Sequence, residues 1–384
     1  MDTPISISSK LPQQGTTIFS VMSALANEHQ AINLSQGFPD FDCSDELKKL
    51  VNKYMKNGYN QYAPMPGVMA LREMIAQKTE SLYSAIYHPE TEITVTAGAT
   101  QAIFTAITAF VREGDEVIVF EPAYDCYVPA IELNGGKAVF AQLKYPNYSI
   151  DWDEVKKLIK RQTRMIIINT PNNPSGSIFS ASDMQKLEKL TRNTDIVILS
   201  DEVYEHIVFD GFEHQSVARF PKLAERSIIV SSFGKTYHTT GWKIGYAVAP
   251  QKLMAEFKKT HQFNVFAVNH PMQLAYAEIL KQKDLYLELS SFYQEKRDFF
   301  LKAISGSKLK PLACSATYFQ LLKYDELSQL KDTEFAKELT SKHKLASIPI
   351  SVFYHKPVDN KVLRFCFAKN NDTLEKAAEI ICKL

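Results

Sequence analysis

The residues with the clearest chemical potential are a lysine, a carboxylate and a tyrosine, each placed shortly after a run of apolar residues. Lys235 follows the run Ile228–Ser231, and Asp201 comes directly after Ile196–Ser200, with Tyr204 three residues further on. A lysine amine can form an imine with an aldehyde, and a carboxylate can hold a protonated ring nitrogen. These side chains could act together if the fold brings them to one place.

Other residues suited to ligand binding also follow strand candidates. Gly98, Ala99 and Thr100 come just before a helix predicted from about Gln101 to Val111, where small residues and free backbone N–H groups can hold a phosphate. Tyr124 could stack on a flat heterocycle. Asn173 lies in a turn-rich segment that carries amide side chains, and Lys243 comes eight residues after Lys235. The set therefore combines a phosphate cradle, an aromatic ring and hydrogen-bond donors.

The elements that must position these residues are short apolar strands that alternate with longer amphipathic segments, a pattern typical of βα units around a mainly parallel sheet. The predicted strands are Glu92–Thr96, Glu116–Phe120, Ala138–Ala141, Met165–Asn169, Ile196–Ser200, Ile228–Ser231 and Gly245–Ala249. Those at 165–169 and 196–200 are almost wholly apolar, so we expect them at the centre, covered on both faces. Ligands of such sheets bind beyond the carboxyl ends of the strands.

The length of 384 residues predicts two domains, since single cores stop growing at about 250–300 residues. After Pro271 a long helical stretch leads into a mixed region, with predicted strands at Tyr318–Leu322 and Val362–Phe367 and a closing helix at Thr373–Leu384. We expect an α/β fold with a large domain at 45–280 and a smaller α+β domain at 281–384. Residues 1–44 show no strand series and are expected to pack on the smaller domain.

Composition argues against several classes of partner. A net charge of +1 with 23% charged residues gives no global field for nucleic acid or a membrane surface. The five cysteines form no CxxC pair, and the histidines lack ligand spacing, so we expect no metal site. Neither a secretory signal nor a membrane-spanning run is apparent, which favours a cytoplasmic location.

The combined inventory matches what pyridoxal 5'-phosphate requires. The lysine amine would bind the aldehyde, and the carboxylate would keep the pyridine nitrogen protonated, so that the ring can accept electrons from the substrate α-carbon. Asn173 and Tyr204 could donate hydrogen bonds to the phenolate oxygen. Lys235, once released by an incoming amino group, would act as the general base at the α-carbon. A second oxo acid would complete a ping-pong cycle.

Three sequence blocks carry a family resemblance: NTPNNP at 169–174, DEVY at 201–204 and SSFGKT at 231–236, the last followed by GWKIGY at 241–246. They resemble the signature blocks of the class I aminotransferases, which have the fold-type I architecture with a seven-stranded, mainly parallel sheet. The resemblance implies that Lys235 is the Schiff-base lysine, Asp201 the partner of the pyridine nitrogen, Tyr204 and Asn173 the partners of the phenolate oxygen, Tyr124 the stacking ring, and Ala99, Thr100, Ser232 and Lys243 the phosphate ligands.

Three further positions match the family outside the sheet. Gly37 and Arg364 resemble residues that contact the substrate α-carboxylate, and the planar fork of an arginine suits both carboxylate oxygens. Tyr62 resembles a tyrosine that reaches the phosphate in the neighbouring subunit, which implies a homodimer with shared active sites. The chain has Lys243 where aspartate-specific members have arginine, and in this it resembles the branch of kynurenine/glutamine and bacterial methionine aminotransferases.

The expected substrates are a bulky neutral amino acid and a 2-oxo acid. Phe19, Phe38 and Tyr62 are candidates for an apolar pocket wall, and no second arginine can be assigned to a side-chain carboxylate. We therefore favour methionine, with aromatic amino acids or glutamine as further donors. A kynurenine/glutamine aminotransferase with cysteine-S-conjugate β-lyase activity is the main alternative, because a carbanion beside a good leaving group can eliminate.

Each assignment also has an ordinary structural interpretation. Asp201 could be the N-cap of a following helix, Tyr124 could be a core residue, and Arg364 could pair with an internal carboxylate. A non-enzymatic alternative is an aminotransferase-like ligand sensor fused to a DNA-binding domain, which would need a winged helix before Asn33. We expect none there.

Overall fold

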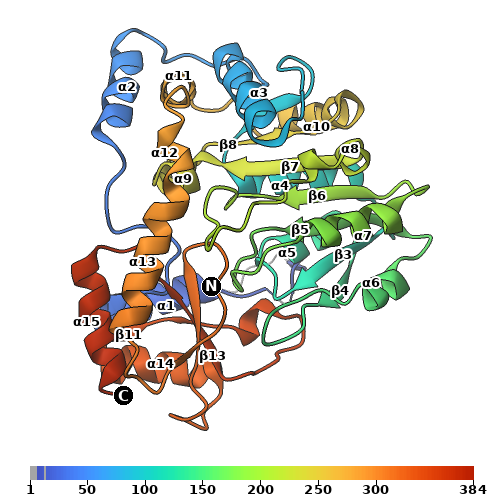
Figure 1. Ribbon diagram of the computed structural model, residues 1–384. Helices are drawn as coiled ribbons and strands as arrows, with labels where there is room; N and C mark the ends of the chain where they lie inside the picture. Colours follow the sequence, from blue (N-terminus) through green and yellow to red (C-terminus); the bar gives the residue numbers. More distant parts are fainter. Residues whose placement is uncertain (1–6, 13) are drawn as a thin grey trace.

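The largest of the three sheets in the described residues has seven strands, and every strand predicted between residues 92 and 249 belongs to it. A computed structural model describes residues 7–12 and 14–384; residues 1–6 and 13 of the expected N-terminal segment lie outside the described residues. In spatial order the strands are β2 (Ile93–Thr96), β8 (Gly245–Val248), β7 (Ser227–Ser232), β6 (Val197–Asp201), β5 (Thr163–Asn169), β3 (Glu116–Glu121) and β4 (Lys137–Gln142). Only β8 runs antiparallel to its neighbours among these strands (Figure 1). The expected central position of β5 and β6 is confirmed.

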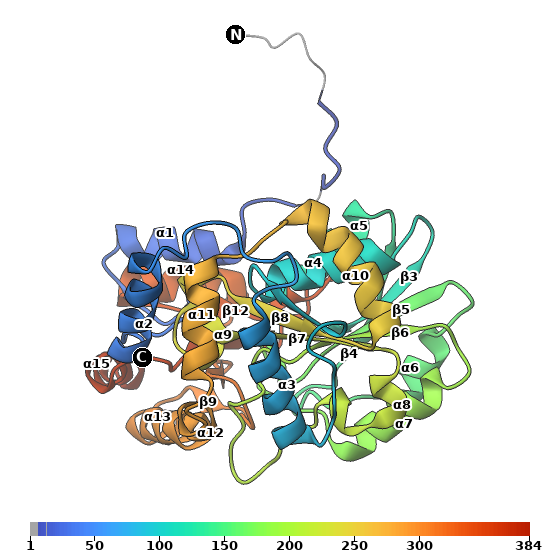
Figure 2. The same cartoon turned by 90° about the horizontal axis from the view of Figure 1, so that it is seen from above.

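Successive side chains of a strand point to opposite faces of the sheet, and in these strands the side chains on both faces are apolar. Both faces of the sheet are therefore buried. Val117 and Val119 of β3 belong to one buried cluster, whereas Ile118 and Phe120 belong to another. The first cluster includes residues of α4 (Ala99–Phe110), α5 (Tyr127–Leu133) and α10 (Gln251–Asn264), and the second includes residues of α3 (Met69–Tyr83), α6 (Trp152–Leu158), α7 (Ala181–Thr191) and α8 (Pro221–Ala224). Figure 2 shows these two helical layers on either side of the sheet. The fold is therefore the expected α/β, fold-type I arrangement.

The C-terminal part of the chain forms a smaller antiparallel sheet with its own helices. Its strands are β12 (Ile348–Pro349), β13 (Val362–Cys366), β10 (Phe319–Lys323) and β9 (Lys310–Pro311), in that spatial order. The helices of this part are α12 (Asp284–Leu287), α13 (Leu289–Ala303), α14 (Asp332–His343) and α15 (Asn371–Cys382), with α13 packed against α15. The strands and helix predicted here are thus present with slightly shifted ends.

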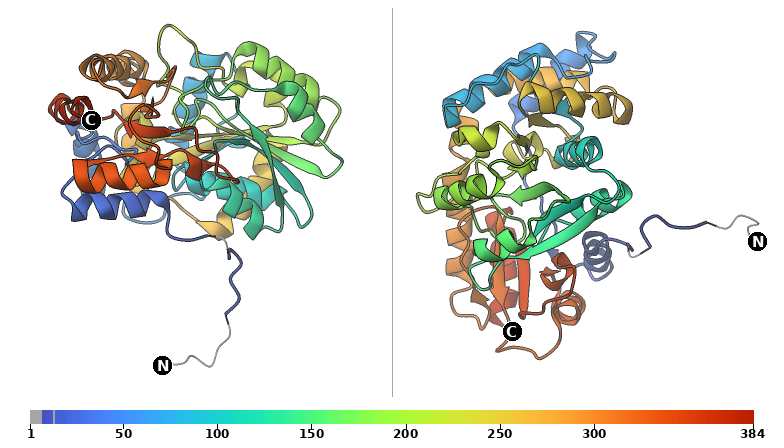
Figure 3. Two further views of the ribbon diagram at one scale, coloured as in Figure 1. Left: turned by 90° about the horizontal axis from the view of Figure 1, so that it is seen from below. Right: turned by 90° about the vertical axis from the view of Figure 1, so that its right-hand side faces the viewer.

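The N-terminal segment lies against this C-terminal part. Helix α1 (Ile18–Glu28) packs on α14, as the left view of Figure 3 shows, and β1 (Ile32–Asn33) pairs in parallel with β11 (Leu345–Ala346). The sequence predicted no strand in this region, and β1 corrects that. A two-residue strand is too short to show the alternation from which strands are inferred.

The remaining elements connect these layers. They are α2 (Asp45–Lys56), which packs against α11 (His270–Ile279), the short helix α9 (Phe233–Thr236), and the 3-10 turns η1 (Val217–Arg219), η2 (Thr240–Trp242) and η3 (Ser351–Phe353). In the described part of the chain, no helix has the length and apolar character needed to cross a bilayer.

Candidate active site

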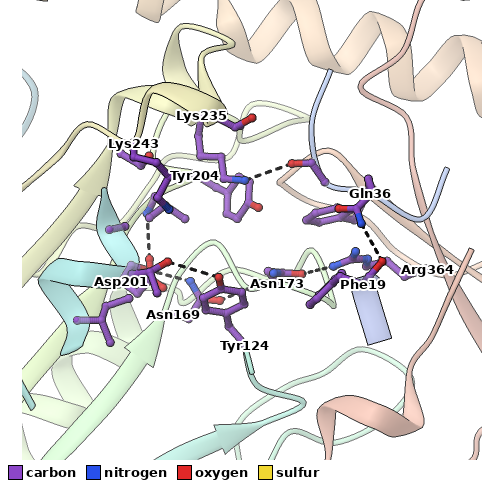
Figure 4. Close-up of a pocket in the computed structure, with 18 residues that line it drawn as sticks. Phe19, Gln36, Tyr124, Asn169, Asn173, Asp201, Tyr204, Lys235, Lys243 and Arg364 are labelled. Atoms are coloured by element: carbon purple, nitrogen blue, oxygen red, sulfur yellow. Dashed lines mark hydrogen bonds between the residues drawn. The ribbon is translucent and has the colours of Figure 1, made fainter. Parts of the chain in front are cut away.

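One cavity at the carboxyl edge of the large sheet brings together nearly all the predicted site residues. It is lined by Phe19, Gly37, Ala99, Thr100, Tyr124, Asn173, Asp201, Tyr204, Ser232, Lys235, Lys243 and Arg364. Figure 4 shows these side chains converging from the strand ends on one side and from the N- and C-terminal parts on the other. Residues spread from 19 to 364 therefore form a single site.

Lys235 projects into this cavity from α9, the short helix that follows β7. Its Nζ donates hydrogen bonds to the Tyr318 hydroxyl at 2.9 Å and to the Gly37 carbonyl at 3.2 Å. The second of these bonds is drawn in Figure 4. Burial lowers the pKa of the Lys235 amine to about 8, because the charged form loses its hydration. The lowered pKa makes the neutral, nucleophilic form of this amine easier to reach near physiological pH than it is for an exposed lysine.

Asp201 is the last residue of β6 and is almost fully buried. Its Oδ2 accepts a hydrogen bond from the Tyr127 hydroxyl at 2.6 Å, and its Oδ1 accepts one from the backbone N–H of Val203 at 3.3 Å. Burial raises the pKa of this carboxyl to about 6. A turn rather than a helix follows, so the N-cap interpretation is wrong. A buried carboxylate at this position would favour a cationic partner such as a protonated ring nitrogen.

Tyr204 and Asn173 provide polar groups between Asp201 and the far end of the cavity. Burial raises the pKa of the Tyr204 phenol, so that it stays protonated and can donate a hydrogen bond. Its ring meets that of Tyr318 edge to face, with centroids 5.3 Å apart. The backbone N–H of Asn173 donates to Oδ1 of Asn169 at 2.8 Å, which fixes the turn that carries the Asn173 side chain.

The opposite wall is formed where the chain enters α4. Gly98 has a φ of +82°, and a Cβ there would lie 3.1 Å from Cε of Lys243, so glycine leaves room for this lysine. Thr100 lies within 3.5 Å of the Tyr124 hydroxyl through its Oγ1. Backbone N–H groups at the start of α4, two hydroxyls and an ammonium would suit a phosphate. Tyr124 thus lines the cavity, as the sequence predicted.

Arg364 lies at the other end of the cavity on β13 and is 1% exposed. Its guanidinium donates to Oδ1 of Asn173 at 2.7 Å and to the Ser35 carbonyl at 3.0 Å, and it stacks 3.9 Å above the ring of Phe319. Its Nε has no hydrogen-bond partner. Burial lowers the pKa of Arg364 to about 10. Both hydrogen-bond partners, a side-chain amide and a backbone carbonyl, are neutral. The guanidinium therefore pairs with no carboxylate of the described residues and is suited to bind one from a ligand.

Sequence reasoning missed several residues that complete the site. Tyr318 contacts the Lys235 amine, Tyr127 holds Asp201, and Gln36, Asn169 and Phe319 line the cavity. Signals were available for some of them. Asn169 ends a predicted strand, and Tyr127 follows Tyr124 by three residues, a spacing that places both on one side of a helical turn. Tyr318 is the first residue of a predicted strand, but the sequence did not indicate which elements this strand would pack against.

Two aromatic residues expected near the substrate do not line the cavity. Phe38 is 46% exposed and packs under the Lys369 ammonium, so its assignment to the pocket wall of this chain is wrong. Tyr62 is 80% exposed and meets only the edge of the Phe266 ring among the described aromatic contacts. Exposure of Tyr62 leaves its hydroxyl available to a neighbouring subunit, and its role in such a shared site stays a prediction.

Three features together define a class of enzyme: the seven-stranded sheet, Lys235 after β7, and Asp201 at the end of the neighbouring strand β6. Comparison with known proteins identifies the same class. Residues 29–381 match the family model described as aminotransferase class I and II, and the chain belongs to this family. Members of the family use pyridoxal phosphate. The protein is thus a pyridoxal-phosphate-dependent aminotransferase that acts on amino acid and 2-oxo acid substrates.

Three individual members of this family illustrate how similar the chain is to known proteins. The chain is 51% identical to the methionine aminotransferase of Escherichia coli, with 99% of each chain covered. It also superposes on a crystal structure that identifies a methionine aminotransferase function in an Escherichia coli protein. The TM-score is 0.97, and the superposition covers 99% of this chain and 100% of that one. It is 32% identical to human kynurenine–oxoglutarate transaminase 1, over 94% of this chain and 93% of the relative. The structure of N-succinyldiaminopimelate aminotransferase from Mycobacterium tuberculosis is 35% identical, with a TM-score of 0.95, over 98% of this chain and 100% of that chain.

The donor set in the cavity fits the cofactor of the family. Near one another lie an amine of lowered pKa, a buried carboxylate, two groups that can hydrogen-bond to a phenolate oxygen, and a glycine-lined helix start beside Lys243. Each matches one functional group of pyridoxal phosphate: aldehyde, ring nitrogen, ring oxygen and phosphate.

Proposed function

We propose that the enzyme transfers the α-amino group of methionine, or of another bulky neutral amino acid, to a 2-oxo acid. The observation that carries the proposal is the composition of the cavity: among the described residues that line it, Arg364 is the only arginine. One arginine can hold the α-carboxylate. A donor with a second carboxylate would find no further guanidinium among the described residues that line the cavity.

The side chains around Arg364 favour an apolar substrate side chain. The guanidinium lies 5.3 Å from the ring centre of Phe19 and 5.4 Å from that of Phe353, in addition to its contact with Phe319. A flexible, polarisable thioether packs well against aromatic rings. A side-chain carboxylate placed there would lose hydration without gaining a partner. The similarity to a methionine aminotransferase over nearly the whole chain supports the same substrate class.

At the sheet end, different residues of the chain would each hold a different group of the cofactor. Pyridoxal phosphate, when bound, supplies an aldehyde and an electron-accepting ring. We assign its attachment to Lys235, the ring nitrogen to Asp201, the ring oxygen to Tyr204 and Asn173, the ring face to Tyr124, and the phosphate to Ala99, Thr100, Ser232 and Lys243. Tyr127 would keep Asp201 oriented through its 2.6 Å hydrogen bond.

At the other end, Arg364, Asn173 and Gly37 would orient the substrate. The Arg364 fork binds the two carboxylate oxygens, and this fixes which bond at the α-carbon faces Lys235. The Lys235 amine would take the α-proton of the substrate and would later return a proton. The Tyr318 hydroxyl, 2.9 Å from Nζ, would hold the free amine in place between these transfers.

Tyr62 supports the further proposal of a homodimer. Its ring is largely exposed on the surface near residues 266–272, and it does not line the cavity of its own chain. We assign its hydroxyl to the cofactor phosphate in a second copy of the chain. Each active site would then need residues of both subunits.

A panel of amino donors tests the substrate. With one fixed 2-oxo acid, kcat/KM should be highest for methionine and other bulky neutral donors, and about tenfold or more lower for glutamate and aspartate. A comparable or higher value for glutamate would contradict the pocket assignment.

The resemblance to kynurenine–oxoglutarate transaminase 1 supports β-lyase activity as the second candidate function. Pyruvate released from a cysteine S-conjugate, without added oxo acid and at a rate matching methionine transamination, would favour the β-lyase alternative over the proposal.

A further inference from the structure

A buried ionic cluster lies behind the turn that carries Asp201 and Tyr204, outside the cavity. Its centre is the carboxylate of Glu205, whose side chain is 4% exposed. The donors to Glu205 are the ammonium of Lys78 at 2.6 Å, the hydroxyls of Ser231 at 2.6 Å and Tyr246 at 2.9 Å, and the hydroxyl of Tyr83. No group in this cluster lines the proposed active site.

The residues of this turn face two different sides. Asp201 and Tyr204 line the cavity, whereas Glu202 and Glu205, the residues that directly follow them, point into buried polar surroundings. Glu202 accepts hydrogen bonds from the Ser200 hydroxyl and the Val217 N–H, and it pairs with His214 at 2.8 Å. Each proposed cofactor ligand on this turn thus has a neighbouring carboxylate fixed behind it.

The cluster also ties together the elements that carry other cavity residues. Lys78 and Tyr83 belong to α3, Ser231 precedes the cavity residue Ser232 at the end of β7, and Tyr246 lies on β8, three residues after Lys243. One carboxylate is therefore hydrogen-bonded to three elements beyond its own turn. A shift of Glu205 would be transmitted to the turn at 201–206 before any other segment, since Tyr204 is its direct chain neighbour.

Charge balance keeps this cluster ionised. Burial would raise the pKa of Glu205, but the Lys78 ammonium and the hydrogen bonds outweigh burial and hold the pKa well below its usual range. Burial and the same ammonium lower the pKa of His206 to about 3, so this imidazole is neutral and can accept the 3.1 Å contact from Lys78. All three protons of Lys78 can then be donated, to Glu205, His206 and Tyr246.

The turn at 201–206 contains no regular helix or strand beyond Asp201, so side-chain anchors must contribute to its shape. We propose that Glu205, paired with Lys78, is a positioning residue that holds this turn so that Asp201 and Tyr204 face the cofactor. The inference rests on the proposed function, because it concerns how those two side chains meet pyridoxal phosphate. Neither Glu205 nor Lys78 contacts the cavity, so their effect is indirect.

The test is the pH midpoint of the absorbance change of the bound cofactor in Glu205→Gln, together with the dissociation constant for pyridoxal phosphate. A Tyr204 phenol that donates to the ring oxygen favours the deprotonated chromophore. If the turn shifts, this bond weakens, and the midpoint should rise by about one pH unit, with cofactor binding weakened about tenfold. Glu205→Asp keeps the charge opposite Lys78 but withdraws the carboxylate by one methylene, and should give a smaller rise.

Arg72→Met is the matched control. Arg72 is a buried cation on the same helix α3, bonded to the carbonyls of Gly67, Pro89 and Glu90 rather than to the turn. It should lower thermal stability while leaving the midpoint unchanged.

Three results would overturn the inference: a wild-type midpoint in folded Glu205→Gln, an equal shift in Arg72→Met, or failure of both Glu205 variants to fold, which would assign the cluster to stability alone. Lack of cofactor absorbance in the wild-type protein would contradict the proposed function instead.

Discussion

The two ends of the cavity are built in different ways. At the sheet end, Asp201, Ser232 and Lys235 each lie at a strand terminus or within a few residues of one, and the strands come from one continuous stretch of chain. At the other end, Arg364 meets Asn173 and the Ser35 carbonyl, which are 191 and 329 residues away in sequence. Regular structure positions the first end, whereas tertiary packing alone assembles the second.

This difference separates chemistry from selection of the substrate. The sheet end holds the groups that match the cofactor, which all aminotransferases of this family share. The end around Arg364 holds the carboxylate-binding group and the aromatic side chains Phe19 and Phe319. Changes at the two ends should therefore separate cleanly into effects on the cofactor and effects on substrate binding.

The largest effect is expected from Lys235→Ala at the sheet end. Loss of both the attachment point and the general base should lower the transamination rate by at least about 10⁴-fold. With cofactor and borohydride, the wild-type protein should be labelled at residue 235 and the variant should not. Lys243→Ala, at the same end but assigned to the phosphate, should keep the label while binding the cofactor more weakly. Persistent labelling of another lysine in Lys235→Ala would refute the attachment site.

A smaller effect, confined to the other end, is expected from Arg364→Lys. Lysine keeps the charge but loses the two-pronged geometry, so kcat/KM should fall about 100-fold, mainly through KM for both the amino acid and the oxo acid. The absorbance of the bound cofactor should stay unchanged. Arg297→Lys is a suitable control, because Arg297 pairs with Asp210 outside the cavity. Loss of cofactor absorbance in Arg364→Lys would show that the two ends are not separable.

A further effect, on stability and not on activity, is expected at the sheet end. Because burial raises the pKa of Asp201 to about 6, the folded state binds this proton more tightly than the unfolded chain, whose aspartate pKa is about 3.9. The stabilisation is complete below about pH 4 and is lost as the pH rises through about 6. Asn cannot ionise, so cofactor-free Asp201→Asn should gain up to about 3 kcal/mol relative to wild type between pH 4 and pH 8. Denaturant unfolding at both pH values measures this, and a difference independent of pH would contradict the buried, ionisable carboxyl.

The same contrast explains what the sequence could and could not predict. The strands of the large sheet carry continuous apolar runs, so their order along the chain and the chemistry at their ends were readable from pattern alone. Arg364 and Gly37 were predicted only through the family resemblance, because no local pattern indicates that β13 and the segment after β1 meet at one cavity. β1 itself and the contact of Tyr318 with Lys235 depend on packing between distant segments, and sequence pattern gave neither.

Phe38 illustrates the limit for pocket walls. It stands next to Gly37, which does line the cavity, yet its ring turns outward beneath Lys369, whose ammonium donates to the Phe38 carbonyl. The chain bends at these residues, so the direction of the Phe38 side chain could not be inferred from its place beside a site residue. Phe19, which the sequence analysis also proposed for the pocket wall, does line the cavity, and it reaches it from α1.

The central claim is that Lys235 carries the cofactor while Arg364, the one arginine among the described residues that line the cavity, selects a neutral donor. The most direct test is the absorbance spectrum of the purified, cofactor-loaded protein before and after one addition of methionine, without oxo acid, with glutamate added to a parallel sample. Methionine should convert the absorbance of the lysine-bound cofactor into that of its amine form at least about tenfold faster than glutamate at equal concentration. An unchanged spectrum with methionine, or a faster conversion with glutamate, would contradict the account.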